Sequence, residues 1–230
     1  MVSYDLSYVF KFLPDILSAL PLTLWILLLT TGLGSLLGAL LAWGQLYGDE
    51  VLASLSRGYV FVLRCTPPIV LLFMIFYGLP EFLEWWLGLD VNGWSRTIFV
   101  VTAMTLLFAA SISEVFKSAY EAVPVGQMEA GLSIGLTELQ TFWRILFPQA
   151  FRIALPNISN AILNLLKDTA LAYTIGLADV MGAGNLLIGR NLGNYSLETY
   201  TAVAVIYWGL ALLLSVGSQL LEKSLDAGKR

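Results

Sequence analysis

Residues 16 to 48 read ILSALPLTLWILLLTTGLGSLLGALLAWGQLYG and contain no charged side chain. This run exceeds the roughly 20 apolar residues that an α-helix needs to cross a bilayer. The segment between Glu198 and Glu222 is also uncharged and long enough to span. These two segments predict two transmembrane helices.

The composition of the whole chain agrees with a membrane protein. Of its 230 residues, 58% are hydrophobic and 12% are charged, and the mean hydropathy is +0.79, which is too apolar for a water-soluble domain of this length. The net charge of -4 offers no basic patch for nucleic acid, so we expect no nucleic-acid partner. With no His and one Cys, the chain can build neither a His/Cys metal site nor an intrachain disulfide.

Three further apolar stretches are interrupted or bordered by charge, and we predict that they also span the membrane. They cover about residues 58 to 80, 97 to 117 and 153 to 178. The prediction is an all-α bundle of about five spans, in one transmembrane domain from residue 1 to 230, with the termini on opposite sides. Gly34 and Gly38, four residues apart in the first span, would let another helix approach closely.

The orientation follows from the excess of Lys and Arg in cytoplasmic segments of membrane proteins. If the N-terminus is outside, the inner segments hold Arg57, Lys117, Arg144, Arg152, Lys223, Lys229 and Arg230, and the outer segments hold Lys11, Arg96 and Arg190. We therefore expect the N-terminus outside and the C-terminus inside. In the outer loop, from about residue 79 to 97, Trp85, Trp86 and Trp94 indicate a short helix lying on the outer surface.

The longest polar interval, residues 117 to 152, lies on the inner side in this topology. Pro124 and Gly126 mark a turn in it. A short helix is predicted from Gln127 to Ser133, and Gly135 ends this helix.

A second helix is predicted to start at Thr137 and to run to Pro148. Thr137 is a good N-cap residue, and Gln140 stands at the spacing of a capping box. The interval therefore predicts a helix, turn, helix unit on the inner face. Taken alone, this unit is equally compatible with an interfacial helix that only anchors the loop.

The same interval carries a family resemblance. Glu129, Ala130 and Gly131 are followed by Gly135 and then by the run ILFP at residues 145 to 148. This pattern resembles the EAA loop of permease subunits in bacterial ABC importers. The segments GQMEAG, FPQAFRIALPNISNAI, LLKDTALAYTI and RCTPPIVLLFMIFYGLP are similar to the polar amino acid branch of that family.

The resemblance extends from about residue 18 to 222, with three departures. Gly131 stands where the family usually has Ala, Phe147 where it usually has Leu, and Cys65 where the branch usually has Gly. These are small or apolar changes, which bear on the subfamily more than on the family.

The resemblance implies a permease subunit of an ATP-driven importer of amino acids or related small polar solutes, in the bacterial plasma (inner) membrane. Its implied partners are two cytoplasmic ATPase subunits, a second permease chain, identical or homologous, and an extracytoplasmic solute-binding protein. Because the chain has no G-x-x-x-x-G-K-[ST] sequence, we expect it to bind no cofactor, and ATP and Mg to be bound by the ATPase subunits. The residues that the resemblance assigns to ATPase coupling are Gln127, Glu129, Ala130, Gly131, Gly135, Ile145 and Pro148. Glu129 is alternatively a local cap of its own helix.

Four ionisable residues, Arg64, Glu114, Lys167 and Asp168, lie within or beside predicted spans, where each costs about 2.5 to 3.5 kcal/mol on insertion scales. One interpretation is mutual pairing, for example of Arg64 with Asp168. The other is that Arg64 or Lys167 binds a substrate carboxylate while Glu114 or Asp168 binds its amine.

Pro67 and Pro68 should break the second span just after Arg64, because each proline removes a backbone donor. Broken helices are where transporters place substrate sites, so Pro67 joins the candidate pathway residues. An ion-coupled secondary transporter is the alternative function, although such proteins generally have more spans and internal repeats. A membrane enzyme is disfavoured by the lack of His and of a paired carboxylate motif.

Overall fold

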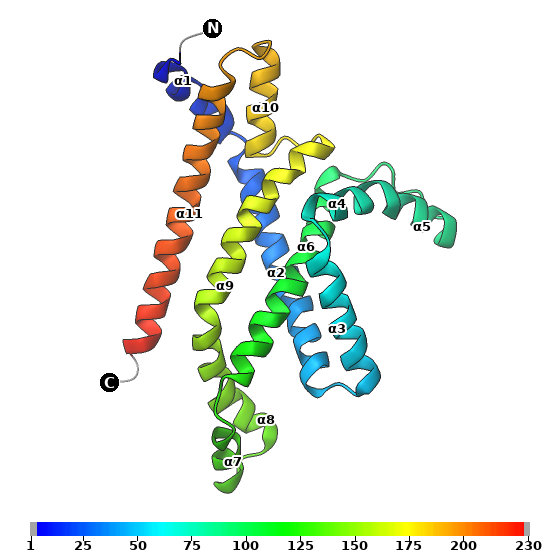
Figure 1. Cartoon of the computed structure of the whole chain (residues 1–230), viewed down its shortest axis with the longest axis vertical. Helices are drawn as coiled ribbons and strands as arrows, with labels where there is room; N and C mark the ends of the chain where they lie inside the picture. The colour runs from blue at the N-terminus through cyan, green and yellow to red at the C-terminus, as the bar shows by residue number, and fades with distance from the viewer. Residues whose placement is uncertain (1–3, 228–230) are drawn as a thin grey trace.

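The computed structural model describes residues 4–227, and all regular structure in that range is helical, as predicted. α1 and the last turns of α11 lie at opposite ends of an elongated bundle (Figure 1). Lys229 and Arg230, which contribute to the predicted orientation, lie outside the described residues. The elements are α1 Leu6–Leu17, α2 Leu20–Tyr47, α3 Glu50–Cys65, α4 Pro68–Phe73, η1 Met74–Gly78, α5 Leu79–Leu87, α6 Arg96–Glu121, α7 Gly126–Ser133, α8 Glu138–Thr141, η2 Phe142–Leu146, α9 Phe147–Thr169, η3 Ala170–Ile175, α10 Val180–Arg190 and α11 Ser196–Ala227.

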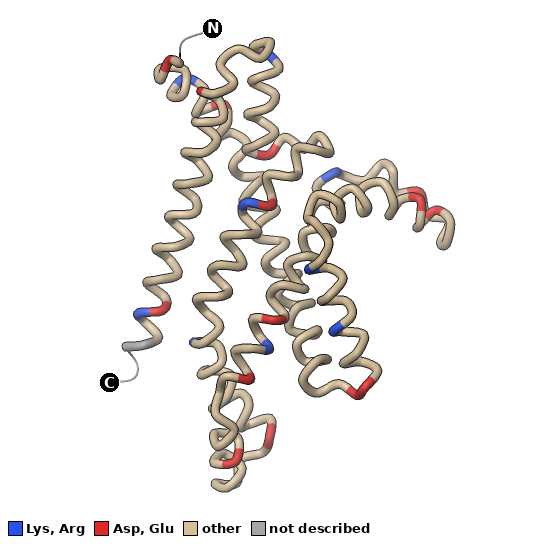
Figure 2. The backbone as a smooth tube through the Cα atoms, viewed as in Figure 1, with Lys and Arg blue, Asp and Glu red and all other residues tan. Residues whose placement is uncertain are grey.

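Four helical segments are long and apolar enough to cross a membrane: Leu20–Tyr47, Pro68–Leu87, Arg96–Glu121 and Ser196–Leu225. A fifth candidate combines Glu138–Ile175 with Val180–Arg190, which meet at a bend of 43°. Charge is absent along α2 and confined to the two ends of α11 (Figure 2). The prediction of about five spans is confirmed.

The span predicted at 58 to 80 has other boundaries in the structure. α3 ends at Cys65, Thr66 and Pro67 are extended, and α4 begins at Pro68. The predicted break after Arg64 is therefore confirmed. The helix breaks there because Pro67 and Pro68 have no backbone N–H to donate. The apolar stretch that is long enough to span is Pro68–Leu87.

Two other prolines are accommodated without a break, by wider helical turns before them. η1 precedes Pro80 and η2 precedes Pro148, and both are π-helical. A proline ring clashes with the carbonyl four residues earlier, and a π turn moves that carbonyl away. The prediction that the second loop helix ends at Pro148 is therefore wrong, because the chain stays helical from α8 through η2 into α9.

The core is divided into two clusters. α6 is more buried than α2, α11 or the Pro68–Leu87 span, with 56% of its apolar window inside the protein, and it contacts α2, α3, α4 and α9. The main cluster consists of Ile26, Leu27, Leu72, Val100, Val101, Ala103, Met104, Phe108, Ile112, Leu165, Leu166, Ala172 and Ile175. A second cluster joins α1 to α10 and α11 through Val9, Phe12, Ile16, Val180, Leu187, Ala202, Val203 and Ile206.

α2 packs on α6 through two glycines. A Cβ atom on Gly34 would lie 2.7 Å from Cδ1 of Phe108, and one on Gly38 would lie 2.3 Å from Cγ2 of Ile112 and 3.0 Å from the carbonyl oxygen of Ala109. The predicted close approach at these two positions is confirmed, and it places α2 against α6.

We expect Gly38→Ala to destabilise the protein, because overpacking a helix contact costs about 1–3 kcal/mol. The matched control is Gly209→Ala on α11, where a Cβ would meet nothing within 4 Å. The measurement is thermal unfolding in detergent, followed by size-exclusion chromatography. A thermal unfolding midpoint for Gly38→Ala as high as that of Gly209→Ala would contradict the close packing of α2 on α6.

Candidate functional site

α7 and α8 form a helix, turn, helix unit beyond the ends of α2 and α6 (Figure 1). This pair of helices, residues 126 to 141, is called the α7 unit below. The observed α7 agrees with the predicted helix from Gln127 to Ser133. Gly135 follows it with a φ of 86°, in the left-handed region that favours glycine. The N–H of Leu136 donates to the carbonyl of Gly131 at 3.2 Å, which closes the turn. The predicted role of Gly135 in ending α7 is confirmed.

α8 starts with the predicted capping box. The Gln140 N–H donates to Oγ1 of Thr137 at 3.3 Å, and the Thr137 N–H donates to Oε1 of Gln140 at 3.0 Å. Helical backbone then continues from Glu138 to Ile175. The unit is therefore attached to the fifth candidate span without a flexible connection.

One face of α7 is fixed to this continuous helix. Nε2 of Gln149 donates to Oε1 of Gln127 at 3.3 Å and to the carbonyl oxygen of Ile145 at 2.8 Å. Gly131 is buried, and a Cβ there would lie 2.4 Å from Cγ2 and 2.7 Å from Oγ1 of Thr141. Thr141 thus explains why Gly131 replaces the alanine that is usual in the family that the loop resembles.

The other face of α7 is exposed. Glu129 and Ala130 are both exposed, and Val125 and Ile134 at the two ends of α7 are each 76% exposed. Glu129 lies in the first turn of α7, where a carboxylate is favoured beside the helix N-terminus, so its alternative role as a local cap stays a prediction. Pro148 is also exposed. Apolar side chains presented this far from the core are typical of a protein-binding surface.

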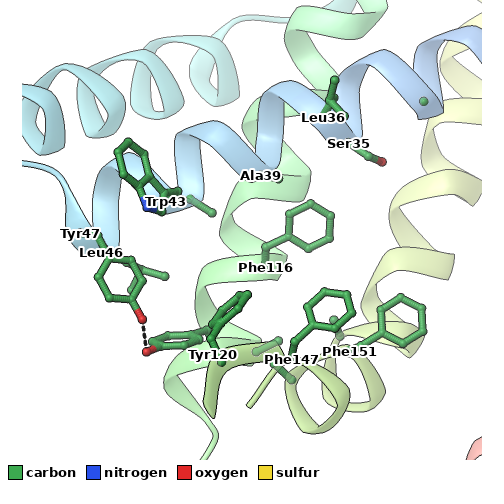
Figure 3. Close-up of a pocket in the computed structure, with 16 residues that line it drawn as sticks. Ser35, Leu36, Ala39, Trp43, Leu46, Tyr47, Phe116, Tyr120, Phe147 and Phe151 are labelled. Carbon is green, nitrogen blue, oxygen red and sulfur yellow. Dashed lines mark hydrogen bonds between the residues drawn. The ribbon is translucent and has the colours of Figure 1, made fainter. Parts of the chain in front are cut away.

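A row of aromatic rings joins this unit to the ends of α2 and α6. The hydroxyl groups of Tyr47 and Tyr120 are hydrogen-bonded to each other (Figure 3). The ring of Phe142 lies 6.3 Å from that of Tyr120 and 6.2 Å from that of Phe147, and Phe151 stacks on Phe147 at 6.0 Å. Phe147, the second departure from the family pattern, is therefore a central member of this row. The sequence analysis did not find the row, because its rings come from three separate segments.

A polar cavity of about 380 Å³ lies higher in the bundle, between α3, α4, α6 and α9. Its lining residues are Leu63, Arg64, Thr66, Pro68, Met104, Leu107, Phe108, Ser111, Val115, Asn157, Asn160, Ala161, Asn164, Leu165 and Asp168. Of the predicted pathway residues, Arg64 and Asp168 line it. Pro67 does not, although both of its neighbours do.

Two of the four predicted charges do pair, but the partner of Arg64 is Glu114, and the example of Arg64 with Asp168 is wrong. Nη1 of Arg64 lies 3.8 Å from Oε2 of Glu114, and this is the one ion pair among the side chains of residues 4–225. Arg64 lies in the last turn of α3, which packs on α6, the helix that carries Glu114. Lys167 is exposed and does not line the cavity, whereas the neighbouring Asp168 does line it.

The sequence analysis missed three cavity residues on α9. Asn157, Asn160 and Asn164 are spaced by three and four residues, and Asp168 continues the series. This spacing puts all four on one helix face. A polar stripe of that periodicity inside an apolar span was the signal that could have found them.

Residues 34–227 match the family model described as "Binding-protein-dependent transport system inner membrane component". The chain belongs to this family. The match covers the helices that form the α7 unit, the aromatic row and the polar cavity. As a member of this family, the chain is an inner membrane protein, and its long apolar helices lie in that membrane.

Relatives of this inner membrane component include the "L-cystine transport system permease protein TcyL" of Bacillus subtilis (strain 168), 36% identical over 96% of this chain and 91% of the relative. The "Glutamine transport system permease protein GlnP" of Escherichia coli (strain K12) is 30% identical over 96% and 98%. Among solved structures, an "amino acid ABC transporter with histidines" matches with a TM-score of 0.83 and 26% identity, over 97% of this chain and 100% of that one.

We expect Gly131→Ala to loosen α7 from α8, because the added Cβ would lie within 3 Å of Cγ2 and Oγ1 of Thr141. Thr141→Ala should compensate, because it removes both of these atoms. Limited trypsin digestion at Arg144 measures the loosening. Cleavage should be faster in Gly131→Ala and should return toward the wild-type rate in the double variant. Independent, additive effects of the two substitutions would show that the positions do not touch.

Proposed function

We propose that this inner membrane protein is the permease subunit of an ATP-driven importer of amino acids or related small polar solutes. In this proposal the α7 unit docks on separate ATPase subunits, and the polar cavity is part of the solute pathway. The observation that carries the proposal is the continuous helix that joins the exposed α7 unit to the cavity wall. The relatives, which are permease proteins for amino acids and cystine, favour this function over an ion-coupled secondary transporter.

The proposed orientation puts the α7 unit in the cytoplasm and α1 outside. Support comes from Lys117, Arg144 and Arg152, which lie in or beside the α7 unit, because basic residues collect on the cytoplasmic side. The proposed partners are two ATPase subunits at α7, a second permease chain, and an extracytoplasmic solute-binding protein at the opposite end. ATP and Mg would bind the ATPase subunits, since this chain has no Walker A sequence.

For coupling, we propose that the exposed face of α7, with Glu129 and Ala130, contacts the ATPase, and that Gln127, Gly131 and Ile145 fix α7 to the span. ATP-driven movement of the ATPase would then displace α7 and its helix together as one rigid body. The contacts of Gln149 and Thr141 with α7 support this division, because they hold it from the side opposite to Glu129.

For the solute, the cavity offers the groups that a zwitterion needs. Arg64 can meet the carboxylate, Asp168 the amine, and the asparagines of α9 the remaining polar groups. The side chains of Arg64 and Glu114 are 55% and 35% exposed, and exposed ion pairs are worth only about 0.2–1 kcal/mol. A solute carboxylate could therefore replace Glu114 as the partner of Arg64 at a small cost in free energy.

We predict that Arg64→Ala and Asp168→Asn fold normally but transport poorly. Loss of the weak Arg64 pair should leave the folded yield unchanged, whereas loss of a charged contact to the solute costs about 1.5–3 kcal/mol, or about tenfold or more in apparent affinity. The control is Lys167→Gln, which changes the neighbouring charge outside the cavity wall. Uptake by reconstituted vesicles is the measurement, and equal uptake by all three variants would reject the cavity as the pathway.

We predict that Gly135→Val uncouples transport, because a left-handed conformation costs a side-chain-bearing residue about 1–2 kcal/mol and α7 would be re-aimed. Gly135→Asn is the matched control, since asparagine tolerates positive φ. Pull-down of the ATPase and solute-stimulated ATP hydrolysis should fail for the valine variant and persist for the asparagine variant. Full ATPase binding and uptake by Gly135→Val would place coupling elsewhere.

A further inference from the structure

A second cavity, of about 350 Å³, forms an apolar groove between α2, α6 and the start of α9 (Figure 3). Its lining residues are Gly32, Ser35, Leu36, Ala39, Ala42, Trp43, Leu46, Tyr47, Phe116, Ala119, Tyr120, Phe142, Phe147, Ala150, Phe151 and Ala154. Apart from Gly32 and Ser35, every lining side chain is apolar or aromatic. The groove shares no lining residue with the polar cavity.

The groove has the length and position of one leaflet of a bilayer. From Gly32 to Tyr47 the α-helical rise is about 22 Å, and one leaflet with its headgroup region is about 20 to 22 Å thick. The groove thus extends from the middle of the span to its end. Trp43, Tyr47 and Tyr120 lie at that end, and aromatic residues of this kind mark the interface between hydrocarbon and headgroups.

The groove is continuous with the part of α2 that faces lipid. Leu36, Leu40 and Trp43 are 69%, 63% and 57% exposed, and only 28% of the apolar window of α2 is buried. Among residues 4–227, none that lines the groove is charged. Water is a poor occupant of such a site, because it needs polar partners. The solvent that surrounds α2 in the inner membrane is phospholipid.

We propose that the groove is a binding site for an acyl chain of a membrane phospholipid, in the leaflet on the side of the α7 unit. The chain lies between α2 and the aromatic row, and its headgroup lies near Tyr47 and Tyr120. It contacts Phe142 and Phe147, which belong to the helix that carries α7. Its dispersion contacts fill a space that would otherwise leave these rings unsupported, so bound lipid holds the end of α2 against that helix.

The test compares phospholipid retention in the purified, complete complex. Ala39→Phe combined with Ala150→Phe fills the groove from two walls, and Leu28→Phe adds a similar ring to an exposed part of α2 outside it. After exhaustive detergent washing, phosphate analysis should find retained phospholipid in the wild type and in Leu28→Phe, and its loss in the double variant. Equal retention in all three proteins would overturn the proposal.

Two further measurements identify the occupant. Palmitoyl-oleoyl phosphatidylethanolamine, added to delipidated complex, should raise the unfolding midpoint of the wild type but not of the double variant. Glycerophosphoethanolamine, which has the headgroup without acyl chains, should give no shift, and a shift equal to that of the intact lipid would contradict acyl-chain binding. In a Cys65→Ser background, efficient crosslinking of Ala39→Cys to a second permease chain would show that protein covers the groove, and would also overturn the proposal.

Discussion

The rest of the structure depends on the continuous helical backbone from Glu138 to Ile175. Inside a membrane, irregular backbone is costly because its polar groups must be satisfied within the protein, and the π turn at η2 lets the helix continue past Pro148. From Glu138 to Asp168 the helix is about 45 Å long. It therefore joins an exposed surface at one end of the molecule to a polar cavity deep in the bundle. A helix that ended at Pro148 would separate the two.

Two substitutions relative to the family pattern are explained by their neighbours. Gly131 is required by Thr141, whose side chain occupies the space of a Cβ, and Thr141 is fully buried. Phe147 extends a row of rings from Tyr120 to Phe151. Both changes affect the joint between α7 and the spans, and neither alters its exposed face. The two departures thus lie in this joint, whereas Glu129 and Ala130 on the exposed face of α7 match the pattern that the loop resembles.

Much of the fold was predictable, because the signals are local. Uncharged runs, the capping box at Thr137, the glycine at 135 and the proline pair after Arg64 act within a few residues, and the structure contains each of them. The helix end at Pro148 and the partner of Arg64 were wrong. Both depend on how a turn or a neighbouring helix is placed in three dimensions. The pairing of Arg64 with Glu114 links α3 to α6, and nothing in the sequence spacing selects Glu114 over Asp168.

The second core cluster has a consequence for biosynthesis. α1 leaves the ribosome well before α10 and α11, yet its apolar face packs on these two helices. The backbone N–H of Asp5 donates to Oε1 of Glu198 at 2.9 Å, across 193 positions of the chain. Contacts of such long sequence separation form late. α10 and α11 must therefore be translated before α1 finds its partners, and a chain truncated before α10 leaves α1 without the residues that it packs against.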